Sequence, residues 1–233
     1  MSITIQPKPD NEYRTQDQWI SFFNEKKQKM ISAPDVYNLV QESSTEAIES
    51  LRTDFRDMWL VTSTRIIYSK DNLKATIIHD ADSIATKPKE YKNILIPEMS
   101  GDFREDKQTE AYLQALFGTK DNIKKILAAL KEISGKDTIR LWTPSQHSRS
   151  EQQIRSVCLN FDDLGRFSVY GVSWFDDYDG CSHGVSSSGP SPKARSEFKS
   201  EKFSEEEIYN DCKTDPSKAI AKMMYNDRYQ KKR

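Results

Sequence analysis

The feature that most constrains the fold is a change in hydrophobic spacing near residue 59. Before it, Ile48, Leu51 and Phe55 recur at intervals of three and four residues, the spacing of one buried helix face. After it, residues 59–69 and 73–79 are rich in β-branched and aromatic residues, and a short turn-forming stretch separates them. Helical and strand patterns in separate stretches predict an α+β domain.

A second hairpin is predicted where two further strand-like segments, 154–161 and 166–174, flank residues 162–165. This connection begins with Asp162 and ends with Gly165, which is typical of a type I turn followed by a bulge. Strand alternation gives the hairpin one hydrophobic face, made of Val157, Leu159, Phe161, Phe167 and Val169. We therefore expect an antiparallel sheet with hairpins near 59–79 and 154–174.

Helices are expected to cover this sheet from three parts of the chain. The N-terminal group precedes residue 59, and the central group includes a helix capped by Thr119 and ended by Gly135. Capping patterns at Ser204 and Asp215 predict a C-terminal group. The expected organisation is a loose lead-in at 1–14, an α+β core at 15–185, a flexible Ser/Pro/Gly-rich loop at 186–203 and C-terminal helices packed on the core at 204–233.

Charge and composition narrow the class of protein. The 233 residues include 35 basic and 36 acidic ones, so the basic excess of a typical double-stranded nucleic-acid binder is absent and such a partner is disfavoured. Three cysteines do not make a disulfide framework. The N-terminus has no apolar signal region, and no apolar run approaches the length of a membrane span. We expect a soluble, cytoplasmic protein without membrane contact.

One interval, residues 137–192, differs from the rest in composition. None of the chain's 23 lysines falls in it, whereas it contains four arginines and two of the four tryptophans. Arginine's planar fork holds carboxylate or phosphate groups in a way that lysine's ammonium cannot. The interval therefore indicates either a well-covered sheet with little solvent-exposed surface or a shared binding pocket.

The first candidate site lies in this interval, in the loop that follows a short strand at 138–142. Trp142 offers a ring for stacking, and His147 and Arg149 offer positive charge. With Arg155 and Trp174, they predict a site for an anionic, nucleotide-like ligand. The alternative is an exposed hydrophilic loop without a ligand.

Arg155 is itself a candidate because strand alternation places it on the same face as Val157. A buried charge needs a partner, and the expected partners are Glu151, Asp176 or Asp177. The two interpretations are a structural ion pair and a contact to the ligand.

The second candidate site is the acidic loop at 176–183. Asp176, Asp177 and Asp179, with His183, are potential ligands of a divalent cation, either Ca²⁺ or Mg²⁺. A cation there would support a hydrolase, whereas a tight acidic turn is the structural alternative.

Other interpretations of these residues remain open. Cys181 and His183 could join a zinc site, but no second ligand pair stands at a standard spacing. The aromatic residues around the acidic loop also suit a protein-interaction module. His79, Asp80 and Asp82 form a further group of potential ligands, with a chance exposed cluster as the alternative. The sequence leaves undecided whether the protein is an enzyme.

Overall fold

The computed structural model describes most of the first 188 residues. The described ranges are 2–10, 12–41, 45–70, 74–102, 104–144, 152–162, 164–174 and 180–188. They belong to one compact unit, Met1–Gly189, and the second unit, Pro190–Arg233, lies outside them. The predicted C-terminal helices and most of the predicted flexible loop therefore fall outside the described residues.

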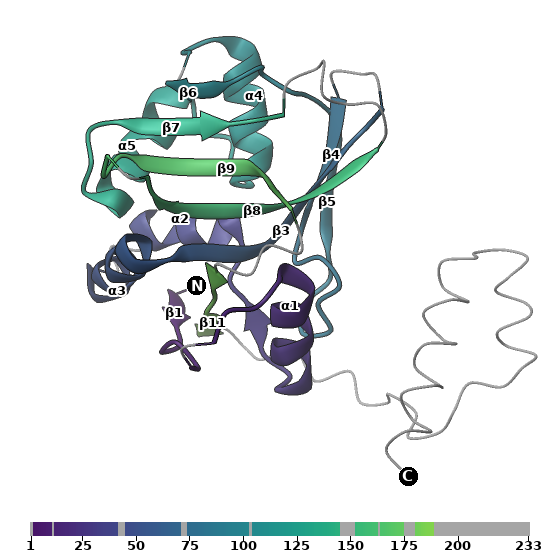
Figure 1. Ribbon diagram of the computed structural model, residues 1–233, viewed down its shortest axis with the longest axis vertical. Coiled ribbons are helices and arrows are strands. Elements are labelled where there is room, and N and C mark those ends of the chain that lie inside the picture. The colour runs from purple at the N-terminus through teal and green to yellow at the C-terminus, as the bar shows by residue number, and fades with distance from the viewer. Residues whose placement is uncertain are drawn as a thin grey trace, which may run out of the picture. The chain divides into compact units, whose positions relative to one another are not determined.

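Two β-sheets form the framework of the described unit (Figure 1). The larger has the order β5-β4-β3-β8-β9-β7-β6, and β10 pairs with the beginning of β3. Its strands are β3 (Trp59–Tyr68), β4 (Lys74–His79), β5 (Lys89–Leu95), β6 (Ser100–Asp102), β7 (Ile139–Trp142), β8 (Gln153–Phe161), β9 (Phe167–Trp174) and β10 (Gly180–Cys181). The smaller, antiparallel sheet has the order β1-β11-β2, from β1 (Ser2–Ile5), β11 (Gly184–Ser188) and β2 (Lys29–Met30).

The α+β class is confirmed, but the prediction of a purely antiparallel sheet is wrong. Both predicted hairpins are present, as β3–β4 and β8–β9. However, β7 pairs with β9 in parallel, and so does β10 with β3. The reason is strand order: β7 lies beside the second strand of the β8–β9 hairpin, and the chain crosses from β7 to β8.

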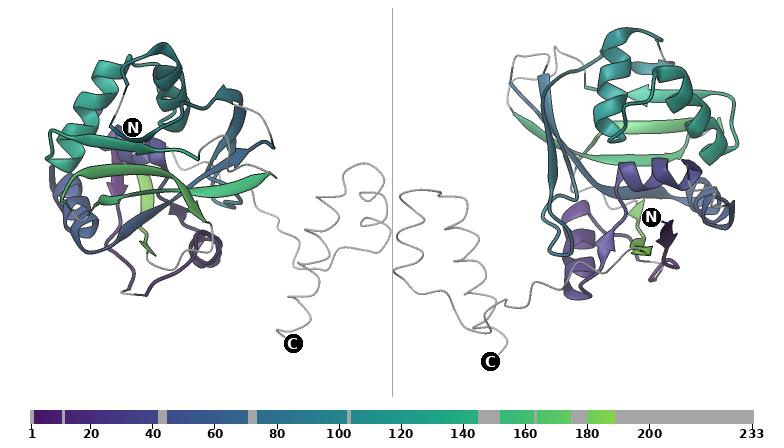
Figure 2. Two further views of the ribbon diagram at one scale, coloured as in Figure 1. Left: turned by 45° about the horizontal axis from the view of Figure 1, so that its top comes forward. Right: turned by 180° about the vertical axis from the view of Figure 1, so that it is seen from behind.

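Four of the five described helices cover one face of the large sheet. These are α2 (Ala33–Gln41), α3 (Thr45–Asp57), α4 (Lys107–Leu116) and α5 (Ile123–Ser134), and Figure 2 shows them together in its right-hand view. The predicted stripe of α3, Ile48, Leu51 and Phe55, is buried in the core beneath them. The fifth helix, α1 (Gln16–Glu25), packs a separate hydrophobic cluster against β3 and β8.

The ends of α5 show one confirmed and one wrong prediction. Gly135 ends the helix in the left-handed conformation with φ 66°, as expected. The N-cap is Asn122, whose side chain accepts a hydrogen bond from the Lys125 amide, and not Thr119. Asn122 directly precedes the first helical residue, whereas the Thr119 hydroxyl accepts from the Asp121 amide in the preceding turn.

The predicted hydrophobic face of the β8–β9 hairpin is confirmed. Leu159 lies opposite Val169 and Phe161 opposite Phe167, and this face packs into the core under the helices. Because side chains alternate along a strand, Cys158 and Asn160 lie on the opposite face of the sheet.

The small sheet joins both ends of the described unit. Within the segment 1–14, expected as a loose lead-in, residues 2–5 form β1 and pair with β11. The Ile31 amide donates to the His183 carbonyl, and the Ser63 amide donates to the Ile31 carbonyl, so the small sheet is hydrogen-bonded to β3. These hydrogen bonds place residues 182–183, which join β10 to β11, between the two sheets.

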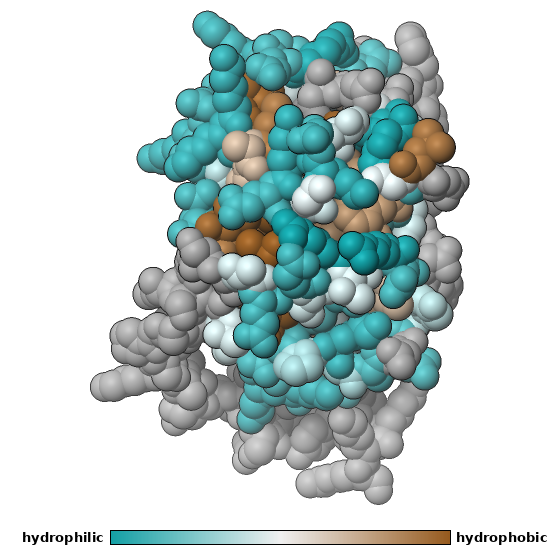
Figure 3. Space-filling model, turned by 90° about the vertical axis from the view of Figure 1, so that its left-hand side faces the viewer, coloured by the Kyte–Doolittle hydropathy of each residue, from teal (hydrophilic) through white to brown (hydrophobic). Residues whose placement is uncertain are grey.

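The described surface has mainly hydrophilic character on the side shown in Figure 3, where hydrophobic residues form small, separate patches. Within the described ranges, none of the helices combines the length and apolar composition that a membrane crossing requires.

Candidate functional site

The predicted ligand residues fall partly outside the described structure. The structure describes Trp142, Arg155, His183 and the backbone of Trp174. Outside the described residues lie His147, Arg149, Asp176, Asp177 and Asp179.

The large sheet separates Trp142 from Arg155. Leu141 belongs to the core under the helices, so the adjacent Trp142 faces the other way. Arg155 pairs in register with the core residue Ile66 and therefore lies on the helix-covered face. It is 7% exposed, and its Nη2 donates to Gln153 Oε1 at 2.9 Å. These two predicted contacts thus do not meet in one pocket.

Trp142 instead belongs to a row of three aromatic side chains on the face of the sheet opposite α2, α3, α4 and α5. The ring centroids of Trp142 and Tyr170 lie 5.7 Å apart with parallel planes, and those of Trp59 and Tyr170 lie 4.5 Å apart. The three rings are half-buried. We call Trp59, Tyr170 and Trp142 the aromatic row; it offers ring surface at the boundary with solvent.

Arg140 lies at the end of the aromatic row. Its guanidinium carbon is 4.7 Å from the Trp142 ring centroid, and its Nη1 is 3.3 Å from Asp162 Oδ2. Arg166 binds the same carboxylate at 2.8 Å, so two cations share one anion and the group carries net positive charge. Burial tends to raise the pKa of Asp162, but hydrogen bonds from Arg166 and Arg140 outweigh it and lower the pKa. A Cβ at Gly101 would stand 2.5 Å from Arg140 Nη2, so glycine makes room for the guanidinium.

Three polar atoms beside the aromatic row are buried without a hydrogen-bond partner in the described structure: Trp142 Nε1, Asn160 Oδ1 and Ser168 Oγ. Asn160 and Ser168 lie opposite each other on β8 and β9, and Ser168 also pairs with Arg140 of β7. A buried polar group without a partner costs about 1–3 kcal/mol. Such groups therefore call for a physical explanation, such as a bound water, ion or ligand.

The surroundings of the aromatic row differ at its two ends. Trp59 and Tyr170 pack on the hydrophobic cluster of α1, which includes Trp19 and Cys158. Toward Trp142, Figure 1 shows no helix of the described residues in front of β7, β8 and β9. The row thus runs from a packed end at α1 to a part of the face that none of the described helices covers.

A shallow groove of about 540 Å³ lies elsewhere, beside α1. Three carboxylates, Glu12, Asp17 and Glu25, help to line it. Its one arginine, Arg14, is paired with Asp10 at 2.6 Å. The groove is therefore acidic and does not suit an anionic ligand.

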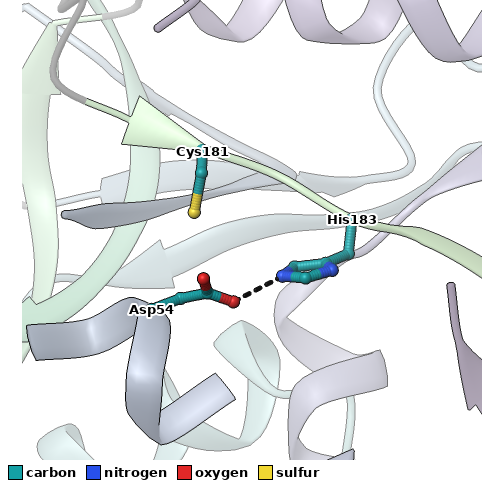
Figure 4. A group of neighbouring side chains, drawn as sticks. All are labelled: Asp54, Cys181 and His183. Carbon is teal, nitrogen blue, oxygen red and sulfur yellow. Dashed lines mark hydrogen bonds and ion pairs between the residues drawn. The ribbon is translucent and has the colours of Figure 1, made fainter. Parts of the chain in front are cut away.

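A second group of functional side chains lies in the interior: Asp54, Cys181 and His183 (Figure 4). One ligand atom from each lies within 4.8 Å of the others. His183 Nε2 is 2.7 Å from Asp54 Oδ2, and its Nδ1 is 2.9 Å from the Gln6 carbonyl oxygen. Cys181 and His183 are 1% exposed and Asp54 is 8% exposed.

Local packing explains how these three residues meet. Asp54 follows Leu51 by three positions in α3, so it lies on the buried side of that helix. Cys181 is placed by β10, where the Trp19 indole donates to the Gly180 carbonyl at 3.1 Å. A Cβ on Gly180 would stand 2.0 Å from Val61 Cγ2, so only glycine allows this close approach.

The hydrogen bonds define the protons of this group. The Gln6 carbonyl can only accept, so His183 Nδ1 carries a proton. His183 Nε2 lies 2.7 Å from Asp54 Oδ2, which is hydrogen-bonding distance. Two acceptors without a proton would repel each other, so one proton lies between these two atoms. Burial, followed by the charge of Asp54, raises the pKa of Cys181 to about 12, so its thiol is protonated at neutral pH.

These protonation states do not fit a cysteine nucleophile. Catalytic cysteines need a lowered pKa and an adjacent base, but both nitrogens of His183 are engaged elsewhere. The arrangement instead resembles a set of metal ligands, because thiol, imidazole and carboxylate converge in a buried place.

The predicted group of His79, Asp80 and Asp82 does not converge, and only Asp82 of the three is exposed. His79 is buried, and both of its ring nitrogens are hydrogen-bonded. Asp80 forms an ion pair with Lys29, and Asp82 forms one with Arg65. Each side chain is thus occupied by a different structural partner.

Several residues of these sites were missed from the sequence, although two signals could have found them. Strand alternation places Arg140 on the face of Trp142, opposite Leu141. Helical spacing places Asp54 on the same side of its helix as Leu51. No local signal indicates that Tyr170 lies beside Trp142, because that neighbourhood depends on strand order.

Comparison of the chain with protein-family models, with curated proteins and with solved structures found no match. A function for this protein is therefore inferred from its side-chain geometry.

Proposed function

We propose that this protein binds an anionic ligand with a planar ring, such as a nucleotide, on the face of β9 and β7 that none of the described helices covers. The observation that carries the proposal is the aromatic row, with Arg140 at its end and three buried, unpartnered polar atoms beside it.

The aromatic row supplies surface for a ligand ring. Bases stack on Trp and Tyr side chains with a gain of about 1–3 kcal/mol per base. Because Trp59 and Tyr170 are anchored at the α1 cluster, the rings lose little freedom when a ligand arrives.

Arg140 supplies the positive charge. Its guanidinium is oriented by the Trp142 ring and by Asp162 before a ligand binds. An oriented guanidinium favours bidentate contact with phosphate or carboxylate oxygens. His147 and Arg149 follow β7 in the sequence and are proposed as further anion contacts.

The three polar atoms supply specificity. Trp142 Nε1 is a donor, Asn160 Oδ1 an acceptor and Ser168 Oγ both. The edge of a nucleobase carries donors and acceptors of matching kinds, and pairing would remove the cost of leaving these atoms unpaired. A plain anion such as inorganic phosphate could contact the Arg140 guanidinium, but it has no ring edge to hydrogen-bond with these three polar atoms.

The proposal is tested by tryptophan fluorescence and thermal shift of the full chain. The probes are nucleoside monophosphates, ribose phosphate without a base and inorganic phosphate. We expect the nucleotides to quench fluorescence and raise Tm, and both base-free probes to bind at least tenfold more weakly.

A matched pair of variants locates the site. Arg140→Gln removes the guanidinium beside Trp142 and is expected to weaken nucleotide binding by about 10- to 100-fold. Arg166→Gln removes the other partner of Asp162 and one charge of this group but no contact to the Trp142 ring, and should weaken binding by no more than about threefold. Absence of any nucleotide effect on the folded protein, or equal binding by both variants, would refute the proposal.

A further inference from the structure

We propose that Asp54, Cys181 and His183 form a buried binding site for a transition-metal dication of the zinc type. This site is separate from the proposed ligand face and does not depend on it.

The donor set selects the class of metal. Thiolate, imidazole nitrogen and carboxylate oxygen are the three ligand types that zinc takes in proteins. Ca²⁺ and Mg²⁺ prefer oxygen ligands alone, so a site with sulfur and nitrogen disfavours both. The three side chains come from α3, β10 and the residue before β11, and Figure 4 shows them pointing toward one another.

His183 already has the orientation of a metal ligand. Metal-binding histidines usually donate their second ring N–H to a carbonyl or carboxylate, which fixes the tautomer. Here Nδ1 donates to the Gln6 carbonyl, and Nε2 is left directed at Asp54.

Charge balance favours a dication. Without metal, the thiol is neutral, and the imidazole and carboxylate share one proton, so the three side chains together carry no net charge. A dication releases that proton and the thiol proton, and binds thiolate, carboxylate and neutral imidazole. The formal charge of these three side chains and the metal is then again zero. Lys8, whose Nζ lies 3.8 Å from Asp54 Oδ1, adds the same positive charge in both states, so metal binding brings no additional net charge into the interior.

The geometry requires only small movements. Tetrahedral zinc with bonds of about 2.0–2.3 Å separates its ligand atoms by roughly 3.3–3.6 Å. Nε2 and Oδ2, now 2.7 Å apart, would separate slightly. The other ligand atoms, within 4.8 Å of one another, would approach by at most about 1.5 Å, which a rotation of the Cys181 side chain can supply.

The position of the site indicates a structural role. Its ligands connect α3 of the main core with the segment that continues into β11, and β11 holds both β1 and β2. A metal here would fasten the small sheet to the core. Because Cys181 and His183 are 1% exposed, the metal would be out of reach of a large substrate.

Cobalt serves as the spectroscopic probe for this site. The chelator-treated full chain is titrated with Co²⁺ and then with Zn²⁺. We expect one equivalent of Co²⁺ to give thiolate-to-cobalt charge-transfer absorption and the intense visible bands of tetrahedral coordination, and Zn²⁺ to remove both. Zn²⁺ in large excess over its Kd should raise Tm by about 5–10 °C, whereas Mg²⁺ and Ca²⁺ should not.

Variants assign the signal to these residues. The absorption should disappear in Cys181→Ser and persist in Cys158→Ser and Cys212→Ser, which remove the other two cysteines. Asp54→Asn keeps the side-chain shape and should weaken Co²⁺ binding at least tenfold. No thiolate–cobalt absorption in the folded wild type would overturn the proposal, even if Cys181→Ser fails to fold. Absorption that survives in folded Cys181→Ser would overturn it as well.

Discussion

Acidification should destabilise this fold through His79. The side chain is 2% exposed, its Nε2 donates to the Ala115 carbonyl at 2.9 Å, and its Nδ1 accepts from the Thr64 hydroxyl at 3.1 Å. That hydroxyl accepts in turn from the Ala33 amide, so its proton is available for the imidazole. The neutral ring matches both bonds as they stand, whereas a second proton on Nδ1 would reverse the bond to Thr64 and turn the hydroxyl proton away from its present acceptor.

The size of the effect follows from the pKa of His79. Burial, helped by the nearby Lys89, lowers it from 6.5 to about 4. Lys29 acts in the same direction, whereas Asp35 and the Ala115 carbonyl oppose it. The unfolded chain binds a proton below pH 6.5, but folded His79 does not until about pH 4. The contribution of neutral His79 to the free energy of unfolding is therefore fully present above pH 6.5 and is lost as the pH falls to about 4. At about 1.4 kcal/mol per pH unit, the total loss is about 3 kcal/mol.

Urea unfolding of wild type and His79→Gln at several pH values between about 7.5 and 4.5 measures this effect. Glutamine can donate to the Ala115 carbonyl and accept from Thr64 without titrating, and all other titratable groups are common to both proteins. We expect the free energy of unfolding of the wild type to fall more steeply below pH 6.5, by about 1 kcal/mol per pH unit relative to the variant. Parallel pH profiles would refute the reasoning.

Two further changes test the packing around the proposed sites. Gly180→Ala should lower the free energy of unfolding by about 1–3 kcal/mol, since its Cβ would stand 2.0 Å from Val61 Cγ2; unchanged urea unfolding would contradict this close approach. Lys29→Met should cost about 2–4 kcal/mol near neutral pH, because Lys29 Nζ lies 2.8 Å from Asp35 Oδ1 and 3.3 Å from Asp80 Oδ2, and its loss leaves two largely buried carboxylates uncompensated. A cost below about 1 kcal/mol in the same assay would show that this cluster is hydrated.

Local patterns in the sequence were sufficient for the α3 helix, the β3–β4 and β8–β9 hairpins and their hydrophobic faces. The spacing of Ile48, Leu51 and Phe55 predicted a helix face that is indeed buried. Alternation along the β8–β9 hairpin predicted one hydrophobic face that includes Leu159 and Val169, and these two residues lie opposite each other in the sheet. These predictions succeeded because each depends on residues close together in the chain.

The sites depended on contacts that no local pattern contains. The lysine-free interval made Trp142 a candidate, but its neighbour Tyr170 was set by the order of β7 and β9 in the sheet. Arg155 was correctly expected on the core face, and the same sheet then separated it from Trp142.

The sequence by itself determined the α+β class, the helix and strand periods and the hydrophobic faces that must be buried. Only the tertiary structure decided the parallel pairing of β7 with β9, the joining of β1 to β11, and the meeting of Asp54 with His183, 129 positions apart. The physical reason is that periodicity fixes how a side chain points relative to its own helix or strand. The neighbours it then meets follow from how the whole chain closes around one core.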